Sequence, residues 1–167
     1  MLIAVDTNVL FDQIFCEADV MDALDVIGRR LHPRFIVTPT VLHELAFKAD
    51  DEAECEEDRE VAVQVLESLL EWGYEPLNFI PVGHGIVEQI GFKLRSAGVL
   101  PDVEENDSYV IAEAALTGCA MLLSSDWHML DAQQHPQFRP ILKGCDVEGD
   151  NLVIARPRTI VRQYFNT

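Results

Sequence analysis

The sequence has few cations and no long apolar run, and each of these absences excludes a class of protein. Its 167 residues contain 12 Lys and Arg against 29 Asp and Glu, which gives a net charge of −17. This is the opposite of the basic surface that nucleic-acid-binding proteins usually present. No apolar run approaches the roughly 20 residues of a membrane span, and Asp6 interrupts the apolar start that a secretory signal needs. We therefore expect a cytoplasmic protein with no membrane partner.

Motifs of several common protein classes are also missing. The four cysteines include no Cys-x-x-Cys pair, which argues against a zinc site. The first glycine is Gly28, so the glycine-rich turn that follows the first strand of dinucleotide-binding domains is absent. The first strand ends in Asp-Thr-Asn at 6–8, whereas haloacid-type phosphatases have Asp-x-Asp there. Dinucleotide binding and this phosphatase chemistry are therefore set aside.

Apolar and amphipathic segments alternate along the chain. Short apolar runs predict strands at 2–5, 34–38, 78–82, 119–125, 139–143 and 151–155. Helical spacing of apolar residues predicts helices at 18–31, 39–49, 60–73, 85–98 and 108–118, and a last helix starting at Pro157. This alternation predicts an α/β sandwich with a mainly parallel sheet. Because no linker or internal repeat is visible, residues 1–167 are expected to form one domain.

Four acidic side chains are expected to meet at one edge of this sheet. Asp6 and Asp126 each follow an apolar strand, and parallel strands end at a common edge, where open α/β sheets bind ligands. Glu44 lies one turn into the helix after the second strand. Asp107 lies at a helix start, with Asn106 as the expected cap. Both helix starts belong to the same edge, so the four acids face one small volume.

A cluster of carboxylates requires a balancing cation. Carboxylates held close together cannot all stay ionised without a counter-charge, and oxygen ligands suit Mg²⁺ or Mn²⁺. Such an ion supports the hydrolysis of phosphodiesters. Each acid alone also fits a structural role, Asp6 in a turn and Glu44 or Asp107 in the first turn of a helix. Their coincidence at one edge is what favours a metal site.

In their order and surroundings these residues resemble the motifs of the PIN-domain ribonucleases, a family that includes the toxins of VapBC-like toxin–antitoxin pairs. The matching segments are Asp6-Thr7-Asn8 after the first strand, Glu44-Leu45 in TPTVLHELA, Asp107 in ENDSYVIAEAA and Asp126 in LLSSD. Ser124 stands where the family pattern has threonine. The resemblance extends to the closing RPRTIVRQYF and so spans nearly the whole chain.

The resemblance implies a PIN-like fold, a three-layer Rossmann-like sandwich around about five strands. It also implies a metal-dependent endoribonuclease that leaves a 5′-phosphate and a 3′-hydroxyl. The implied catalytic residues, which are also the implied Mg²⁺ or Mn²⁺ ligands, are Asp6, Glu44, Asp107 and Asp126. Thr7 and Ser124 would orient these carboxylates or metal-bound waters, with ordinary turn hydroxyls as the alternative. Asn8 would anchor its loop.

The resemblance further implies an RNA substrate, a small antitoxin partner and, as in many family members, a homodimer. The acidity of the chain favours an alternative, a catalytically silent PIN-like scaffold that serves as a protein-interaction module. The presence of all four acids favours the enzyme. Residues 50–60 hold eight acids and one arginine, and we expect a solvated acidic surface away from the site. A guard over the site that repels RNA is the alternative.

Overall fold

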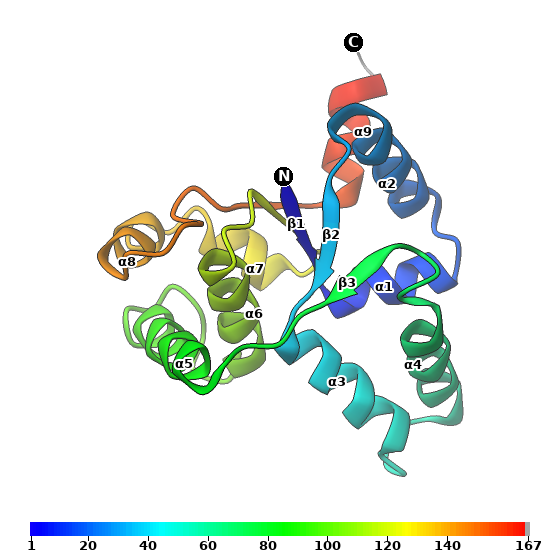
Figure 1. The fold of residues 1–167 in the computed structure, drawn as a ribbon, viewed down its shortest axis with the longest axis horizontal. Helices are drawn as coiled ribbons and strands as arrows, with labels where there is room; N and C mark the ends of the chain where they lie inside the picture. The colour runs from blue at the N-terminus through cyan, green and yellow to red at the C-terminus, as the bar shows by residue number, and fades with distance from the viewer. Residues whose placement is uncertain (166–167) are drawn as a thin grey trace.

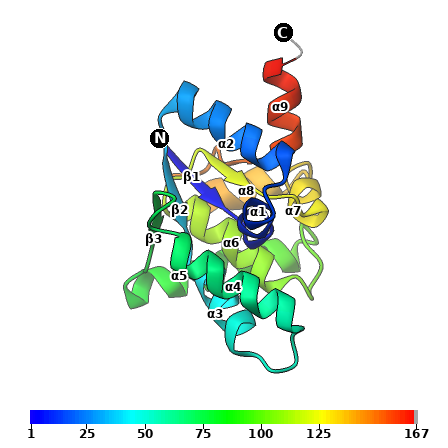
Figure 2. The same cartoon turned by 90° about the vertical axis from the view of Figure 1, so that its right-hand side faces the viewer.

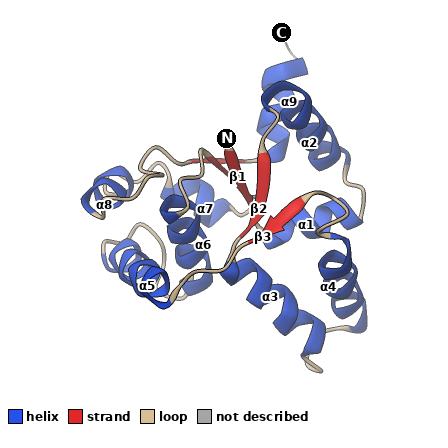
Figure 3. Cartoon of the chain, in the orientation of Figure 1, coloured by secondary structure: helices blue, strands red, loops and turns tan. Residues whose placement is uncertain are grey.

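A five-stranded, all-parallel sheet forms the centre of the computed structural model, which describes residues 1–165 (Figures 1 and 3). The strands are β1 (Leu2–Val5), β2 (Arg34–Val37), β3 (Tyr74–Pro76), β4 (Met121–Leu123) and β5 (Val153–Ala155). They are ordered β3-β2-β1-β4-β5, and every neighbouring pair is parallel. The expected α/β fold around five parallel strands is therefore confirmed.

Helices cover the sheet on both sides. In the described part of the chain they are α1 (Thr7–Ile14), α2 (Ala18–Leu31), α3 (Pro39–Asp50), α4 (Glu56–Ser68), α5 (Pro81–Ser96), α6 (Glu105–Leu116), α7 (Trp127–Ala132), α8 (Phe138–Gly144) and α9 (Pro157–Phe165). Figure 2 shows α2 beside α9 at one end of the molecule and α3 with α4 at the other. None of these helices has the length and apolar character needed to cross a membrane.

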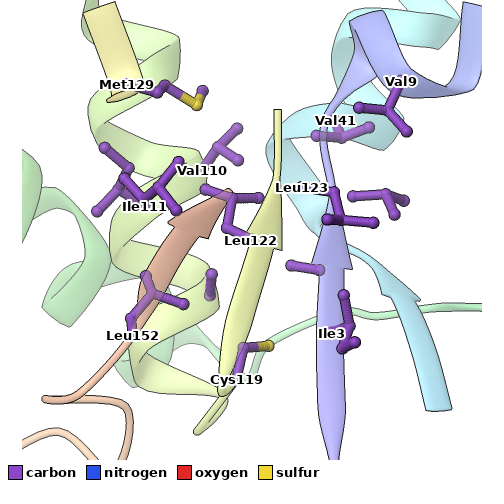
Figure 4. Packing of buried hydrophobic residues seen from close by; sticks show 14 of the residues in the cluster. Ile3, Val9, Val41, Val110, Ile111, Cys119, Leu122, Leu123, Met129 and Leu152 are labelled. Carbon is purple, nitrogen blue, oxygen red and sulfur yellow. The ribbon is translucent and has the colours of Figure 1, made fainter. Parts of the chain in front are cut away.

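The neighbouring strands β1 and β4 are apolar because helices cover both faces of the sheet. The fully buried side chains on these strands are those of Ile3, Ala4, Val5, Leu122 and Leu123. Figure 4 shows this packing, in which α6 lies against β4. The strand arrows of β1 and β2 point toward the starts of α1 and α3 (Figure 1). The buried strands thus hold the residues at their carboxyl ends in fixed positions.

Two predicted strands are wrong. Residues 139–143 lie in α8, because Phe138 and Leu142 are four residues apart and are buried together on one helical face. Residues 78–82 are not a strand either, since Pro81 begins α5. The third strand lies just before, at Tyr74–Pro76.

Helix α1 is not among the helices predicted from the sequence. Asp6 is the N-cap of this helix, which begins at Thr7 immediately after β1. Because no loop separates β1 from α1, the amino end of α1 lies directly at the carboxyl edge of the sheet. The acidic residues are expected at this edge.

Candidate active site

A cavity of about 390 Å³ opens at the carboxyl edge of the sheet. Its lining residues are Asp6, Thr7, Asn8, Phe11, Glu44, Lys48, Asp58, Asp107 and Asp126. The structure therefore brings all four predicted acids to one cavity, although they come from four separate parts of the chain.

Asp6 is held by a tight set of hydrogen bonds at the end of β1. Its side chain is only 5% exposed. Its Oδ1 accepts the backbone N–H of Thr7 at 2.8 Å. Its Oδ2 accepts hydrogen bonds from Asn8 Nδ2 at 2.6 Å and from the Ser124 hydroxyl at 2.7 Å. The Asn8 Oδ1 also accepts the Ser125 N–H at 3.0 Å, so Asn8, which lies in α1 rather than in a loop of its own, holds the loop after β4.

Ser124 connects the carboxyl ends of β1 and β4. Its hydroxyl donates to Asp6 and accepts the backbone N–H of Asp126 at 3.0 Å. The Asp126 Oδ1 in turn accepts the His128 N–H at 2.6 Å and caps α7. One buried hydroxyl thereby fixes the relative position of two of the four acids.

The Ser124→Ala variant is expected to lower the free energy of unfolding by about 1–3 kcal/mol, because it leaves the buried Asp6 carboxylate short of a donor and the Asp126 N–H short of an acceptor. Urea unfolding checks this value. Ser125→Ala is the matched control, since the Ser125 side chain makes no hydrogen bond in the described chain. Equal stability of the two variants would contradict the role of the Ser124 hydroxyl.

Glu44 approaches the same cavity from the second turn of α3. The Thr7 hydroxyl donates to Glu44 Oε2 at 2.8 Å, so the start of α1 orients this carboxylate. Lys48, one turn further along α3, also lines the cavity and pairs with Glu54 at 3.4 Å. Helix α3 therefore presents both an acid, Glu44, and a cation, Lys48, to this cavity.

Asp107 occupies the first turn of α6, but its expected cap is wrong. The helix begins at Glu105, and Asn106 lies within its first turn rather than at the cap position, which is Glu104. The Oδ2 of Asp107 is buried and has no hydrogen-bond partner among the described residues. Because buried acceptors are nearly always satisfied, this oxygen is available to bind a cation.

Burial and mutual repulsion disfavour ionisation of these acids. Burial raises the pKa of Asp6 to about 6, against the hydrogen bond from Ser124, and the charge of Glu44 adds to the rise. Burial likewise raises the pKa of Asp107 to about 7, and the charges of Asp6 and Asp126 raise it further. The carboxylates therefore lie close enough to repel one another.

This environment fits a hard divalent cation. The acids offer oxygen donors alone, they carry excess negative charge, and Asp107 has an unpaired buried oxygen. No three His, Cys, Asp or Glu side chains within residues 1–165 are already placed to hold an ion. Both oxygens of Asp6 accept hydrogen bonds from the protein itself.

Glu113 is a structural partner of the site that the sequence analysis missed. It is 2% exposed on α6 and accepts hydrogen bonds from the Thr40 N–H at 3.0 Å and the Thr40 hydroxyl at 2.8 Å. Burial raises its pKa. Glu113 thus joins the helix that carries Asp107 to the start of the helix that carries Glu44. A lone acid within the apolar segment SYVIAEAALTG is the sequence signal for it.

Asp58 places the acidic segment 50–60 beside the site rather than away from it. The helix α4 begins within this segment, and Glu56, Glu57 and Asp58 form its first turn. Acids stabilise this end of a helix through its dipole. Most of the segment is exposed, as expected, but Asp58 lines the cavity. The expectation that the whole segment lies apart from the site is wrong.

No curated protein matches the sequence. One similar solved structure is VapBC2 from Rickettsia felis bound to a DNA fragment from their promoter, at 14% identity and a TM-score of 0.63, over 93% of this chain and 98% of that chain. A second is VapBC-1 from nontypeable Haemophilus influenzae, at 15% identity and a TM-score of 0.58, over 80% of this chain and 93% of that chain.

A third similar structure is FitAcB from Neisseria gonorrhoeae, at 19% identity and a TM-score of 0.53, over 78% of this chain and 93% of that chain. At such identities these structures show a shared fold. The sequence itself matches the model of the PIN domain over residues 3–134. This match covers most of the chain and includes the four predicted acids of the cavity, and it shows that the protein belongs to the PIN domain family.

Proposed function

We propose that this protein is a metal-dependent endoribonuclease and the toxin of a toxin–antitoxin pair. The observation that carries the proposal is the convergence of four carboxylates on one cavity, with an unpaired buried oxygen on Asp107. Membership of the PIN domain family supports nuclease chemistry. The likeness to VapBC and FitAcB structures supports a small antitoxin partner.

The four acids have the role of metal ligands in this proposal. They are Asp6, Glu44, Asp107 and Asp126. The bound Mg²⁺ or Mn²⁺ would supply Lewis-acid activation of water and of the scissile phosphate. The chain's own hydroxyls and amide fix the ligands: Thr7 orients Glu44, while Ser124 and Asn8 hold Asp6.

The cations near the cavity have a second role, which is to contact the RNA backbone. Lys48 lines the cavity itself. Arg156 donates to the Ser125 carbonyl at 3.0 Å and so lies next to the loop that ends in Asp126. In a chain of net charge −17, these two cations and the metal would offset the repulsion of phosphates.

The proposal is tested by incubating a labelled, mixed-sequence single-stranded RNA with the protein and Mn²⁺ or Mg²⁺, beside an EDTA control. We expect cleavage that requires the metal and leaves 5′-phosphate ends. A protein that binds the metal but cleaves no RNA would contradict the nuclease and favour the silent scaffold, the interpretation that the acidity of the chain supports.

A further inference from the structure

A second cavity, of about 450 Å³, lies at the start of α7. Its lining includes Val99, Pro101, Trp127, His128, Gln134 and His135. Trp127 and His128 directly follow Asp126, which lines the acidic cavity. Consecutive residues at the amino end of α7 therefore line the two cavities.

Trp127 presents an aromatic surface at this junction. It is 59% exposed, which is unusual for so large an apolar side chain. Its ring lies against the imidazole of His128, with a centroid separation of 3.6 Å and an angle of 33° between the planes. The backbone N–H of His128 donates to Asp126 Oδ1, which holds the backbone at the start of α7 next to the acids. The result is an anchored aromatic platform one residue from the proposed metal site.

We propose that Trp127 and His128 form a stacking subsite for an unpaired base of the single-stranded RNA substrate, next to the scissile phosphate. This inference rests on the proposed nuclease function. Aromatic side chains bind unstacked RNA bases through their faces, and the exposed indole offers such a face. The apolar walls at Val99 and Pro101 suit a base, and the side chain of Gln134 offers donors and acceptors to its edge.

The local charge favours a base over a phosphate in this subsite. Asp131 lines the cavity, and Glu104 Oε1 lies 3.6 Å from His128 Nε2. These acids repel an anionic phosphate but tolerate a neutral base. An acidic protein can therefore hold RNA largely by stacking, with few phosphate contacts. Because counterion release scales with phosphate contacts, RNA binding is expected to depend only weakly on salt.

The continuity of the platform with the acidic cavity is the reason to assign it to RNA rather than to a protein partner. A phosphate bound at Asp126 would place the neighbouring nucleotide near Trp127, the next residue along the chain. A partner protein on Trp127 is the competing occupant, and it predicts that Trp127 makes no difference to RNA binding.

The first test measures binding of a short, labelled single-stranded RNA in the Asp107→Asn background, where cleavage is expected to be lost. Adding Trp127→Ala is expected to weaken binding about tenfold, the effect of losing one stacked base. Trp127→Phe keeps an aromatic face and is expected to stay within about threefold. Phe47→Ala is the matched control, because Phe47 is also 59% exposed but lines a different cavity.

The second test uses fluorescence. The chain has two tryptophans, so Trp72→Phe leaves Trp127 as the only reporter, and RNA is expected to quench it. In the otherwise native enzyme, Trp127→Ala is expected to raise KM and leave kcat within about twofold, since stacking is a binding contribution. Normal cleavage with unchanged KM and no quenching would overturn the subsite and leave the nuclease standing. A native protein that neither binds nor cleaves RNA would overturn both.

Discussion

Replacing Asp107 with asparagine is expected to lower metal-dependent RNA cleavage by at least about a hundredfold, since a metal ion contributes several kcal/mol of transition-state stabilisation that depends on its ligands. The same change is expected to leave the melting temperature of the metal-free protein equal or higher. The reason is that burial and the neighbouring charges already disfavour the ionised carboxylate. Cleavage assays and thermal unfolding of one preparation check both results.

The matched control for this variant is Asp102→Asn. Asp102 is an exposed residue of the loop before α6, so its substitution is expected to change neither cleavage nor stability. An Asp107→Asn protein that is folded and cleaves RNA at the native rate would contradict the proposed role of Asp107. A large loss of stability would show that the carboxylate has a structural role instead.

Acidification from pH 8 to about pH 5 is expected to stabilise the metal-free protein. Carboxyls in unfolded chains titrate near pH 4, whereas the folded protein raises the pKa of Asp6 to about 6 and that of Asp107 to about 7. Between these values the folded state binds more protons, so the free energy of unfolding falls as the pH rises. The expected difference is about 1–3 kcal/mol, or roughly 5 °C in melting temperature.

The double variant of Asp6→Asn and Asp107→Asn separates this effect from the general repulsion in an acidic chain. Its melting temperature is expected to vary less with pH than that of the native protein. Addition of Mn²⁺ is expected to stabilise the native protein more at pH 8 than at pH 5, because protons compete with the metal for the same oxygens. Equal pH profiles for the native protein and the double variant would locate the effect elsewhere.

The positions of the site acids were predictable from the sequence where the topology of a parallel sheet determines them. The apolar segments before Asp6 and Asp126 are buried strands, and parallel strands end at one edge. Those two facts alone bring the two acids to a common edge. Glu44 and Asp107 follow because a helix that starts after a parallel strand, or returns to one, begins at that same edge. The convergence of all four acids on the cavity was therefore predictable.

The remaining features depend on tertiary contacts that a linear pattern does not contain. The third strand is only three residues long, and the ring of its Tyr74 is fixed by a hydrogen bond to Gln13 at 2.7 Å. The segment 139–143 in α8 is as apolar as a short strand. It is a helix because Phe138 and Leu142 are buried together on one helical face. The pairing of Glu113 with Thr40 joins residues far apart in sequence.

Part of the negative charge of the chain is explained by two groups of acids. The first turn of α4 concentrates acids where the helix dipole favours them, and the cavity acids would be neutralised by a bound divalent ion. The chain retains a strongly negative charge beyond these groups. Contacts with bases rather than phosphates, as inferred for Trp127, reconcile that charge with an RNA substrate.

The most direct test of metal binding at the four acids is diffraction from crystals grown with Mn²⁺, recorded where manganese scatters anomalously. The arrangement described above predicts an anomalous peak in the acidic cavity, coordinated by carboxylates drawn from Asp6, Glu44, Asp107 and Asp126. An acidic cavity that contains no peak, in a protein saturated with Mn²⁺, would contradict the metal site and with it the proposed nuclease.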